Sequence, residues 1–322
     1  MTRVHVWGAS GYAAAEVMRL VDGHPFLELG ALESRSHGGA RVADHFPLLR
    51  KTAYAFTASG SVAASVRSGD IVVAAGGHGE ALAHVPAFLA AGARVVDLSA
   101  DYRFDDAAAY GLPEWNAEAI AGADLVANPG CYPTASLLAM LPALALGRAQ
   151  QLIVDAKSGI TGAGRNPSVG ALYAEVAGDI RAYGLAGHRH QPEIERALAA
   201  RDALAPLVFT PHVVPLSRGM LADCYLIFTQ PVDADALALA YENAYHGSSF
   251  VRILGSELSP SVAAVCGTND AEIRVDVRGN VVRAVCAIDN LGKGAAGSAL
   301  QNINLMLGYP QETGLHARAI VA

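Results

Sequence analysis

The sequence has few charged residues, no long apolar run and only a modest excess of acid. Charged residues make up 16% of the 322 residues and apolar residues 52%, which is typical of a compact globular protein and excludes a disordered chain. The net charge of −7 argues against a nucleic-acid partner. No uninterrupted apolar run reaches the roughly 18 residues of a membrane span, so no membrane partner is expected either.

Cysteine is also scarce. The chain has Cys131, Cys224, Cys266 and Cys286, and no two of them form a CxxC pair. A disulfide framework is therefore not expected, and no residues have the spacing of structural zinc ligands. The first residues predict a strand and a turn rather than a secretory signal. These absences favour a reducing, cytoplasmic location and no bound metal.

A glycine turn near the N-terminus predicts a dinucleotide-binding unit. Gly8 and Gly11 lie between an apolar run and a helical pattern, where glycines let the backbone approach a pyrophosphate at a helix N-terminus. Strand and helix patterns then alternate as far as residue 130. This alternation predicts an α/β fold with a doubly wound parallel sheet. The candidate cofactor contacts in the loop are Gly8, Ser10, Gly11, Tyr12 and Ala13.

The end of the second predicted strand bears on the choice of cofactor. It has the sequence Glu33-Ser34-Arg35-Ser36. Cations and hydroxyls at this point suit the 2′-phosphate of NADP, whereas an acid suits the ribose hydroxyls of NAD. Arg35, Ser34 and Ser36 therefore predict NADPH or NADP as the cofactor. Glu33 weakens that preference if it points at the ribose.

The stretch NPGCYPT (128–134) contains a candidate nucleophile. Cys131 follows a predicted strand, and Pro133 suits the first turn of the helix that follows. A thiol at a helix N-terminus is expected to have a lowered pKa, and a nucleophile needs that thiolate. Asn128 is a candidate donor to a developing oxyanion. The alternative is a buried inert thiol, which suits the apolar settings of the other three cysteines.

Two histidines in GHRHQPEIERAL are the candidate proton-transfer partners. His188 and His190 are expected just before a helix whose first turn contains Pro192, a position that favours neutral imidazole. In an extended segment they point to the same side, with Arg189 opposite. His190 is preferred as the acid or base, and the choice between the two stays open.

Two loops rich in glycine and serine are candidate substrate sites. AKSGITGAGRNPS contributes Ser158 and Gly159, although a plain flexible connection is the alternative for this loop. FTPHVVPLSRGM contributes Arg218, whose guanidinium can hold a carboxylate or phosphate bidentately. Further on, the sequence predicts a hairpin that turns at Gly279-Asn280. A last helix with Leu300, Ile303 and Leu307 on its apolar face is expected to pack on the first domain.

These motifs together resemble the N-acetyl-γ-glutamyl-phosphate reductase family of the semialdehyde dehydrogenase superfamily. The matching strings, in the family's order from residue 8 to beyond residue 307, are GASGYAAAE, SRS, VDLSADYRF, YGLPEWN, NPGCYPTASLLAMLPAL, AKSGITGAGR, GHRHQPEIE, FTPHVVPLSRGML, GTNDAEIRV and AIDNLGKGAAGSALQNINLMLG. The chain departs from the family at three places on the cofactor side: Ala13 to Ala15 where glycine is usual, GGHG (76–79) in place of PHG, and Glu33.

The resemblance implies a fold and a domain plan. A Rossmann-type NADP-binding domain over 1–130 is completed by a C-terminal helix at about 293–322. An α+β domain with a mixed sheet over 131–292 serves catalysis, substrate binding and oligomerisation, in a homodimer or homotetramer. Ser99 in VDLSADYRF and Asn290 in AIDNL are further candidate cofactor contacts.

The implied reaction is the reductive dephosphorylation of N-acetyl-L-glutamyl 5-phosphate in arginine biosynthesis. Cys131 attacks this small acyl phosphate and releases inorganic phosphate. The thioester is then reduced with NADPH to a thiohemiacetal, which collapses to N-acetyl-L-glutamate 5-semialdehyde. A histidine of the HRH segment is the acid or base.

Two other functions stay open. The carrier-protein-linked aminoadipyl-phosphate reductase of lysine biosynthesis shares the glycine motif, GHRH and AIDNL, but has a CNAT-like turn where this chain has CYPT, and the chain's acidic balance offers no obvious surface for an acidic carrier. A regulator that binds NADP without catalysis is the second, and the intact Cys131, His188 and His190 argue against it. Aspartate-semialdehyde dehydrogenase shares the chemistry but not the strings.

Overall fold

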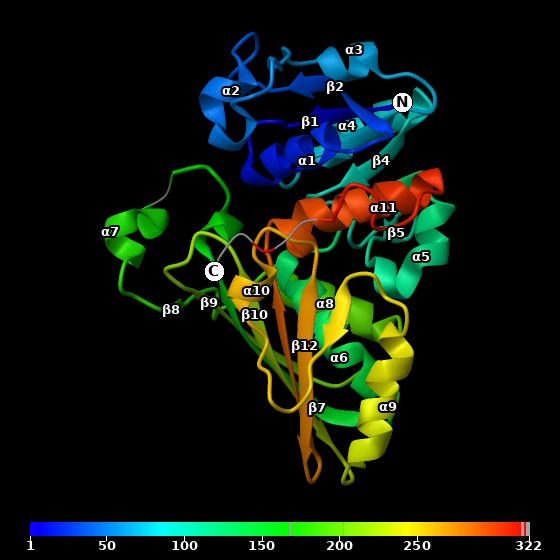
Figure 1. The fold of residues 1–322 in the computed structure, drawn as a ribbon, viewed down its shortest axis with the longest axis vertical. Helices are drawn as coiled ribbons and strands as arrows, with labels where there is room; N and C mark the ends of the chain where they lie inside the picture. The colour runs from blue at the N-terminus through cyan, green and yellow to red at the C-terminus, as the bar shows by residue number, and fades with distance from the viewer. Residues whose placement is uncertain (168, 202, 317–318, 320–322) are drawn as a thin grey trace. The chain divides into compact units, whose positions relative to one another are not determined.

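The computed structural model of the protein describes residues 1–167, 169–201, 203–316 and 319. The chain forms two compact units (Figure 1). The first unit comprises Met1–Pro129 and Ala295–His316, and the second comprises Gly130–Gly294. In the part of the chain that is described, no helix is long and apolar enough to cross a membrane.

The first unit is built on a six-stranded sheet in which every strand pair is parallel. The strands follow the order β2-β1-β3-β4-β6-β5. They are β1 (Thr2–Trp7), β2 (Leu27–Glu33), β3 (Ile71–Ala74), β4 (Arg94–Asp97), β5 (Ala109–Tyr110) and β6 (Leu125–Ala127). The predicted parallel doubly wound sheet is therefore confirmed. The strand order reverses between β1 and β3, and ligands bind at such a reversal in open α/β sheets.

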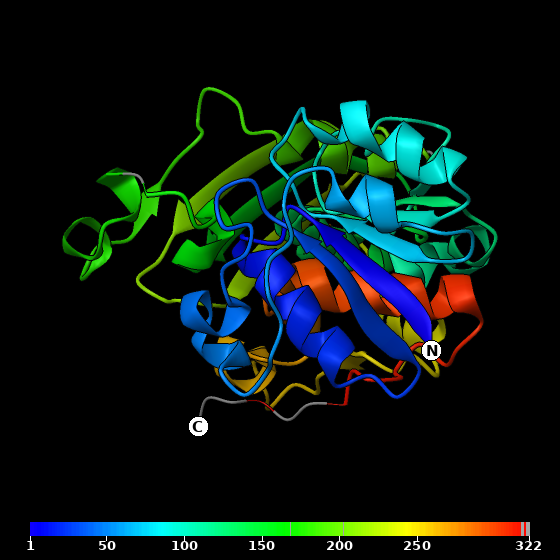
Figure 2. The same cartoon turned by 90° about the horizontal axis from the view of Figure 1, so that it is seen from above.

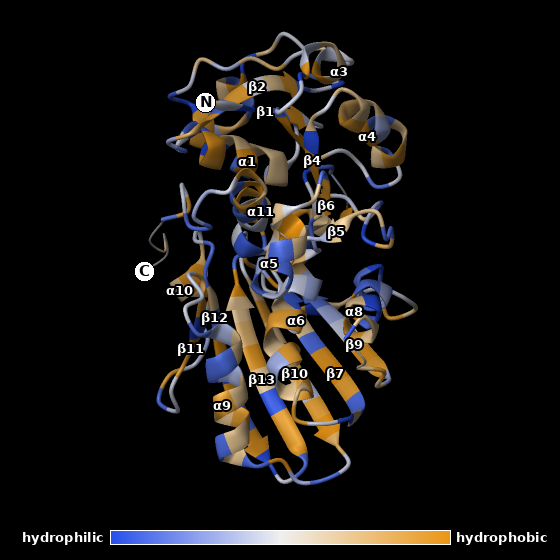
Figure 3. Cartoon of the chain, turned by 90° about the vertical axis from the view of Figure 1, so that its right-hand side faces the viewer, coloured by the Kyte–Doolittle hydropathy of each residue, from blue (hydrophilic) through white to orange (hydrophobic). Residues whose placement is uncertain are grey.

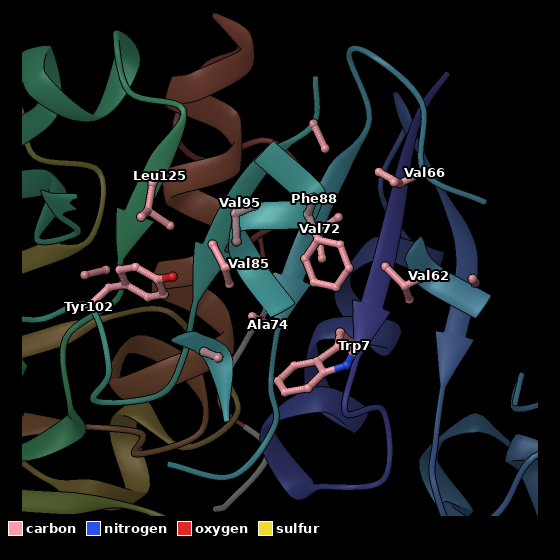
Figure 4. Packing of buried hydrophobic residues seen from close by; sticks show 14 residues of the cluster. Trp7, Val62, Val66, Val72, Ala74, Val85, Phe88, Val95, Tyr102 and Leu125 are labelled. Atoms are coloured by element: carbon pink, nitrogen blue, oxygen red, sulfur yellow. The ribbon is translucent and has the colours of Figure 1, made fainter. Parts of the chain in front are cut away.

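Helices cover both faces of this sheet. They are α1 (Tyr12–Asp22), α2 (Val42–His45), α3 (Ser61–Ser65), α4 (Ala81–Ala90), α5 (Pro113–Ala121) and α11 (Gly297–Leu307), with the short 3-10 helix η1 (Pro47–Leu49). Helices α1 and α11 lie side by side on one face (Figure 2). On the other face, Trp7, Val72 and Val95 from the strands pack against Val85 and Phe88 of α4 (Figure 4).

The end of the chain contributes α11 to the first unit. The π-helix η4 (Gly292–Ala296) leads into α11, and Gly308 ends that helix in a left-handed conformation with φ +73°. Of the segment predicted as helix, about 293–322, residues 317–318 and 320–322 lie outside the described residues. On the predicted apolar face Leu300 and Ile303 are buried, whereas Leu307 is partly exposed.

The second unit is built on a seven-stranded mixed sheet, in the order β11-β12-β13-β10-β7-β9-β8. The strands are β7 (Ala149–Ser158), β8 (Arg181–Ala182), β9 (Leu207–Val213), β10 (Met220–Phe228), β11 (Val251–Ile253), β12 (Ala271–Arg278) and β13 (Val281–Ile288). Pairs β7–β9 and β11–β12 are parallel and the others antiparallel, so the mixed sheet is confirmed. Arg278 pairs with Val281, which places the hairpin turn at Gly279-Asn280 as predicted.

Helix α6 (Cys131–Leu144) lies against this sheet and is buried from Tyr132 to Ala143. The other helices of the unit are α7 (Tyr173–Val176), α8 (His190–Ala199), α9 (Ala234–Tyr245) and α10 (Val262–Val265), with the 3-10 helices η2 (Ile160–Ala163) and η3 (Val169–Ala171). Along β10, buried residues alternate with partly exposed ones, so one face of the sheet packs on α6. The colouring of β7, β10 and β13 in Figure 3 is mostly hydrophobic with hydrophilic interruptions.

Candidate active site

Cys131 is the first residue of α6, as the sequence predicts. Gly130 precedes it in an extended conformation (φ −68°, ψ 157°), and no side chain caps the helix from that position. The N–H of Gly130 donates to Glu193 Oε1 at 2.9 Å, and Glu193 is buried. The first turn of α6 directs its N–H groups toward the region around Cys131, and a helix N-terminus stabilises negative charge. The local geometry therefore suits a thiolate nucleophile.

The two histidines lie together, but not in the predicted extended segment. Helix α8 starts at His190, and Arg189 has helical angles (φ −54°, ψ −26°), so His190 is inside the helix rather than before it. The backbone N–H of His190 donates to His188 Nδ1 at 3.2 Å, and this bond brings the ring centroids to 4.9 Å. The tight turn, rather than strand geometry, places both rings on the same side.

Tyr132 connects the thiol segment with the histidine pair. Its ring centroid lies 5.8 Å from that of His188 and 5.7 Å from that of His190. Its hydroxyl donates to the carbonyl of His212 at 3.0 Å and accepts from the Tyr183 hydroxyl at 3.2 Å. Burial raises the pKa of Tyr132 far above its usual range, so this hydroxyl remains a hydrogen-bond group and not a proton-transfer group.

Burial, together with the charge of Arg189, lowers the pKa of His188 to about 4. His188 is therefore neutral near pH 7. Because its Nδ1 accepts the hydrogen bond from His190, the ring proton of the neutral form is on Nε2. His188 thus has a structural task in holding the start of α8, and this favours His190 for proton transfer.

The two candidate substrate loops are joined by backbone hydrogen bonds. The N–H of Gly159 donates to Gly219 O, and that of Ile160 to Leu216 O, each at 2.8 Å. The first loop is therefore not a plain flexible connection. Ser158 is buried and its hydroxyl donates to the carbonyl of Gly159 at 3.1 Å.

Arg218 lies on the second of these loops and forms an ion pair with the buried Asp289. Its Nη2 is 2.9 Å from Asp289 Oδ2, and its Nε donates to Asp289 Oδ1 at 3.2 Å. The Arg218 side chain is 17% exposed and that of Asp289 is 0% exposed. The guanidinium plane is therefore fixed from inside the protein, with part of the group accessible.

Three other candidate residues hold the fold around them. Asn128 accepts from Asn302 Nδ2 at 3.0 Å in the first unit. The Ser99 hydroxyl donates to Asp97 at 2.8 Å. Asn290, in the second unit, bonds to two loop segments of its own unit. Ligand contacts by Asn128, Ser99 and Asn290 remain predictions.

Two residues near the thiol have no local signal in the sequence. Glu193 is 63 positions from the Gly130 N–H that it accepts from. Gly294 packs so closely that an added Cβ would lie 2.7 Å from the Cβ of Cys131. Both contacts depend on tertiary structure, and only the resemblance of GHRHQPEIE and AIDNLGKGAAG to the family included these positions.

The loop after β1 has the form of a phosphate-binding turn. Gly8 has φ +81°, and a Cβ there would lie 2.6 Å from the backbone nitrogen of Gly76, so only glycine fits. Gly11 precedes α1 without a side-chain cap, and a Cβ on it would meet nothing within 4 Å. Tyr12 and Ala13 begin α1, and Ser10 lies in the turn before it. A pyrophosphate fits this open helix N-terminus.

Glu33 does not serve as a ribose ligand in this arrangement. It is 6% exposed, and both of its carboxylate oxygens are engaged by the start of α3. Oε1 accepts from the Gly60 N–H and Oε2 from the Val62 N–H, each at 2.9 Å. The acid that complicates the NADP prediction is therefore committed to capping a helix.

Ser34, Arg35 and Ser36 follow at the carboxyl end of β2, beside the end of β1. The Ser34 hydroxyl oxygen is buried and has no hydrogen-bond partner among the described residues. Ser36 is exposed, and the Arg35 side chain is 77% exposed and pairs with Glu80 at 2.9 Å. A cation and two hydroxyls at this position fit the 2′-phosphate of NADP.

Across the described residues, no group of three or more His, Cys, Asp or Glu side chains could hold a metal ion. The four cysteines, all within the described part, form no disulfide. Burial raises the pKa of Cys224 well above its usual value, so this thiol on β10 stays protonated. The buried-thiol interpretation therefore suits Cys224, while Cys131 has a different, partly buried setting.

Comparison with known proteins identifies two family models in the chain. The model described as "Semialdehyde dehydrogenase, NAD binding domain" matches residues 3–123. The model described as "Semialdehyde dehydrogenase, dimerisation domain" matches residues 131–290. The two matches together cover most of the chain, with Cys131 at the start of the second.

Several relatives named N-acetyl-gamma-glutamyl-phosphate reductase match over nearly their whole length. The protein of Geotalea daltonii is 42% identical, with 98% of this chain and 99% of the relative covered. The protein of Geobacter sulfurreducens is 41% identical, with 100% of this chain and 100% of the relative covered. The protein of Bordetella pertussis is also 41% identical, with 99% of this chain and 97% of the relative covered.

Solved structures of more distant proteins share the fold. Aspartate semialdehyde dehydrogenase II of Vibrio cholerae, complexed with ASA, matches with a TM-score of 0.75 at 17% identity, over 96% of this chain and 98% of that one. Aspartate semialdehyde dehydrogenase of Candida albicans with NADP matches with a TM-score of 0.72 at 16% identity and the same coverage.

Proposed function

Since this chain belongs to the N-acetyl-γ-glutamyl-phosphate reductase family, we propose that it reduces N-acetyl-L-glutamyl 5-phosphate to N-acetyl-L-glutamate 5-semialdehyde with NADPH, in arginine biosynthesis. The observation that carries the proposal is the position of Cys131 as the first residue of α6, next to a tyrosine whose ring lies against both histidines. The names of the relatives do not favour the lysine-pathway reductase or the non-catalytic regulator.

Cys131 is the proposed nucleophile. Its Sγ attacks the acyl carbon of the substrate, a C–S bond forms, and the C–O bond to phosphate breaks, so that a thioester and inorganic phosphate result. The N-terminus of α6 stabilises the negative charge of the attacking sulfur. Gly130, held through its N–H by Glu193, keeps the start of the helix in place for this attack.

His190 is the proposed acid and base. As a base it receives the thiol proton, and as an acid it protonates the oxygen that gains charge when the thioester is reduced. His188 is the proposed positioning residue, because its Nδ1 holds the His190 backbone while burial keeps its own ring neutral. This assignment favours one of the two histidines that the sequence alone left open.

The proposed cofactor contacts are in the first unit, which we propose as the NADP-binding domain, with the second unit serving catalysis. NADPH, when bound, supplies the two electrons for reduction of the thioester. Gly8, Gly11 and the start of α1 would hold its pyrophosphate, and Arg35 and Ser34 its 2′-phosphate. These residues fit that role because Glu33 is turned to α3 and the Ser34 oxygen is buried without a partner among the described residues.

The proposed substrate contacts are Ser158, at the end of β7, and Gly159 and Arg218, on the two joined loops. The substrate has an anionic phosphate and a carboxylate, and a guanidinium fixed in one plane can bind either bidentately. The hydrogen bonds between the loops limit their movement, which lowers the entropy cost of binding.

We also propose a homo-oligomer, a dimer or a tetramer, in the cytoplasm. The face of the mixed sheet opposite α6 presents partly exposed apolar residues, among them Ile153, Tyr225 and Ile227. Around α7, Tyr173 is 84% and Val169 72% exposed, and apolar patches of this kind mark interaction sites. The dimerisation-domain match covers both regions. Analytical ultracentrifugation tests the proposal, and a monomer at micromolar concentration contradicts it.

The activity is tested in reverse, as phosphate-dependent reduction of NADP⁺ with N-acetyl-L-glutamate 5-semialdehyde. Cys131→Ala is expected to abolish turnover, whereas the control Cys224→Ala, in the same unit, retains it. Activity that survives Cys131→Ala contradicts the mechanism. A panel with carrier-bound aminoadipyl phosphate separates the lysine-pathway alternative, and tight NADPH binding without any turnover selects the regulator.

A further inference from the structure

Asp289 is a buried carboxylate at the meeting point of three chain segments. It directly follows β13 and is 0% exposed. Its oxygens accept from the N–H groups of Gly267 at 2.6 Å and Leu291 at 2.8 Å, in addition to the ion pair with Arg218. A buried charge is tolerated only when it is paired and hydrogen-bonded. The partners of Asp289 are Gly267, 22 positions away, Arg218, 71 positions away, and Leu291 in its own turn.

Its neighbour Asn290 ties together the two substrate loops. Asn290 Oδ1 accepts from the Gly219 N–H at 2.7 Å, and its Nδ2 donates to the Thr161 hydroxyl at 3.0 Å. The Thr161 hydroxyl in turn donates to Ser217 O at 2.6 Å. The residues on either side of Arg218 are therefore fixed by the same turn that holds its guanidinium.

The same turn also reaches the nucleophile. The carbonyl of Asp289 accepts from the Gly294 N–H at 2.9 Å. Gly294 packs on Cys131 with no space for a Cβ, since that atom would lie 2.7 Å from the Cβ of the cysteine. The six residues 289–294 after β13 thus contact both the proposed nucleophile and the proposed anion-binding arginine.

We infer that Asp289 is a positioning residue, which sets the guanidinium of Arg218 relative to the Cys131 thiol for an anionic substrate. Asp289 engages the Nε and Nη2 edge of the guanidinium, so the pairing fixes the plane of the group. This inference rests on the proposed function, because it assumes an acyl phosphate with anionic groups as the substrate.

The test is a double-mutant cycle on Asp289 and Arg218, measured on the full chain in both reaction directions. The variants are Asp289→Asn, Arg218→Ala and the double variant, with Arg218→Lys as a second probe that keeps the charge and loses the bidentate edge. The matched control is Asp276→Asn, which breaks an ion pair of similar geometry with Arg283 on the exposed part of β12 and β13.

Asp289→Asn and Arg218→Lys are each expected to raise the KM for the acyl phosphate, and for inorganic phosphate in reverse, by about 10-fold or more. The KM for NADPH is expected to stay within about twofold, as is every constant of the Asp276→Asn control. The double variant should be little worse than Arg218→Ala alone, because Asp289 acts through the arginine.

Independent, multiplying effects of Asp289→Asn and Arg218→Ala would overturn the inference. So would a fall in melting temperature and kcat with an unchanged KM for the acyl phosphate. If Asp289→Asn does not fold, the KM values of Arg218→Lys decide in the same way. Failure of the proposed function is distinguishable, since in that case the unmodified protein turns over no N-acetylglutamyl phosphate.

Discussion

Arg35 is the single side chain on which we expect the cofactor preference to depend most. Its exposed guanidinium follows β2, where the 2′-phosphate of NADP is proposed to bind. Arg35→Ala is expected to raise the KM for NADPH by about 10-fold or more, because it removes a charge-assisted hydrogen bond to the 2′-phosphate. The KM for NADH should stay within about twofold, because NADH lacks that phosphate. Steady-state kinetics with both cofactors measure this.

The control for Arg35 is its ion-pair partner. Glu80→Gln removes the carboxylate that competes for the guanidinium, so the KM for NADPH should stay the same or fall. An equal rise of the KM for NADPH and NADH in Arg35→Ala would instead indicate a general loss of binding.

Glu33 is expected to matter for stability and not for cofactor choice. Both of its oxygens accept N–H groups at the start of α3, so Glu33→Ala should lower the free energy of unfolding by about 1–2 kcal/mol, the usual effect of losing a helix cap. The ratio of the KM values for NADPH and NADH should change by less than about twofold. Urea unfolding measures the stability of the variant, and steady-state kinetics measure its cofactor preference. A strong shift of the preference between NADPH and NADH would show that Glu33 reaches the ribose.

At the scale of elements, the π-helix η4 packs on the Cβ of Cys131 through Gly294. Gly294→Ala introduces a Cβ with 2.7 Å to the Cβ of Cys131 and 3.3 Å to the carbonyl of Asp289. Either the π-helix or the start of α6 must shift, at about 1–3 kcal/mol for overpacking. Because small displacements of a nucleophile are costly, kcat should fall by about 100-fold.

The matched control for Gly294→Ala is Gly255→Ala. A Cβ on Gly255 meets no heavy atom within 4 Å, and its φ is not in the left-handed region. This variant should keep both its stability and its kcat. A Gly294→Ala protein with unchanged kcat would show that the thiol does not depend on this packing.

Helices and strands whose boundaries are marked by neighbouring residues could be predicted from the sequence. The hydrogen bonds between residues far apart in the chain could not. Cys131 at a helix start follows from its neighbours Gly130 and Pro133, and the alternating strands and helices of the first unit follow from periodicity. The start of α8 is one place where a local rule failed: a proline in the first turn did not exclude helix at His190. The bonds of Glu33 and Asp289 join residues 22 to 71 positions apart, and no local pattern encodes them.

At the scale of the whole molecule, two histidines with lowered pKa values, the buried His24 and the partly buried His188, make stability dependent on pH. His24, at the end of α1, accepts from the Phe26 N–H at 3.1 Å through Nδ1 and bonds to Asn304 of α11 at 3.1 Å through Nε2. Burial lowers the pKa of His24, although the bond to Asn304 partly offsets this, and the pKa of His188 is lowered to about 4.

The direction of the effect follows from proton binding. Both histidines take up a proton more readily in the unfolded chain, with a pKa of 6.5, than in the folded protein. Their contribution to the free energy of unfolding is therefore complete above about pH 6.5. It is lost as the pH falls from there toward the pKa in the folded protein, which is about 4 for His188. The free energy of unfolding should be lower at about pH 5 than at about pH 7.5.

Urea titrations of the unmodified protein and of His24→Gln at the two pH values check this. The variant should be less stable at the higher pH, because it loses the bond to Asn304, but should show a smaller difference between the two conditions. His246→Asn, at an exposed position, is the control and should behave like the unmodified protein. Equal pH differences in all three proteins would exclude His24 as a source of the dependence.

The glycine contacts at the first turn also restrict how the protein can change by mutation. A Cβ at Gly8 would collide with the backbone of Gly76, and one at Gly76 would lie 2.2 Å from the ring of Trp7. Shrinking Trp7 would make space, but it would open a cavity in the core of the first unit at about 3–5 kcal/mol. Any single substitution of this kind at Gly8, Gly76 or Trp7 is therefore expected to destabilise the protein. These three positions can change only if several of them are substituted together.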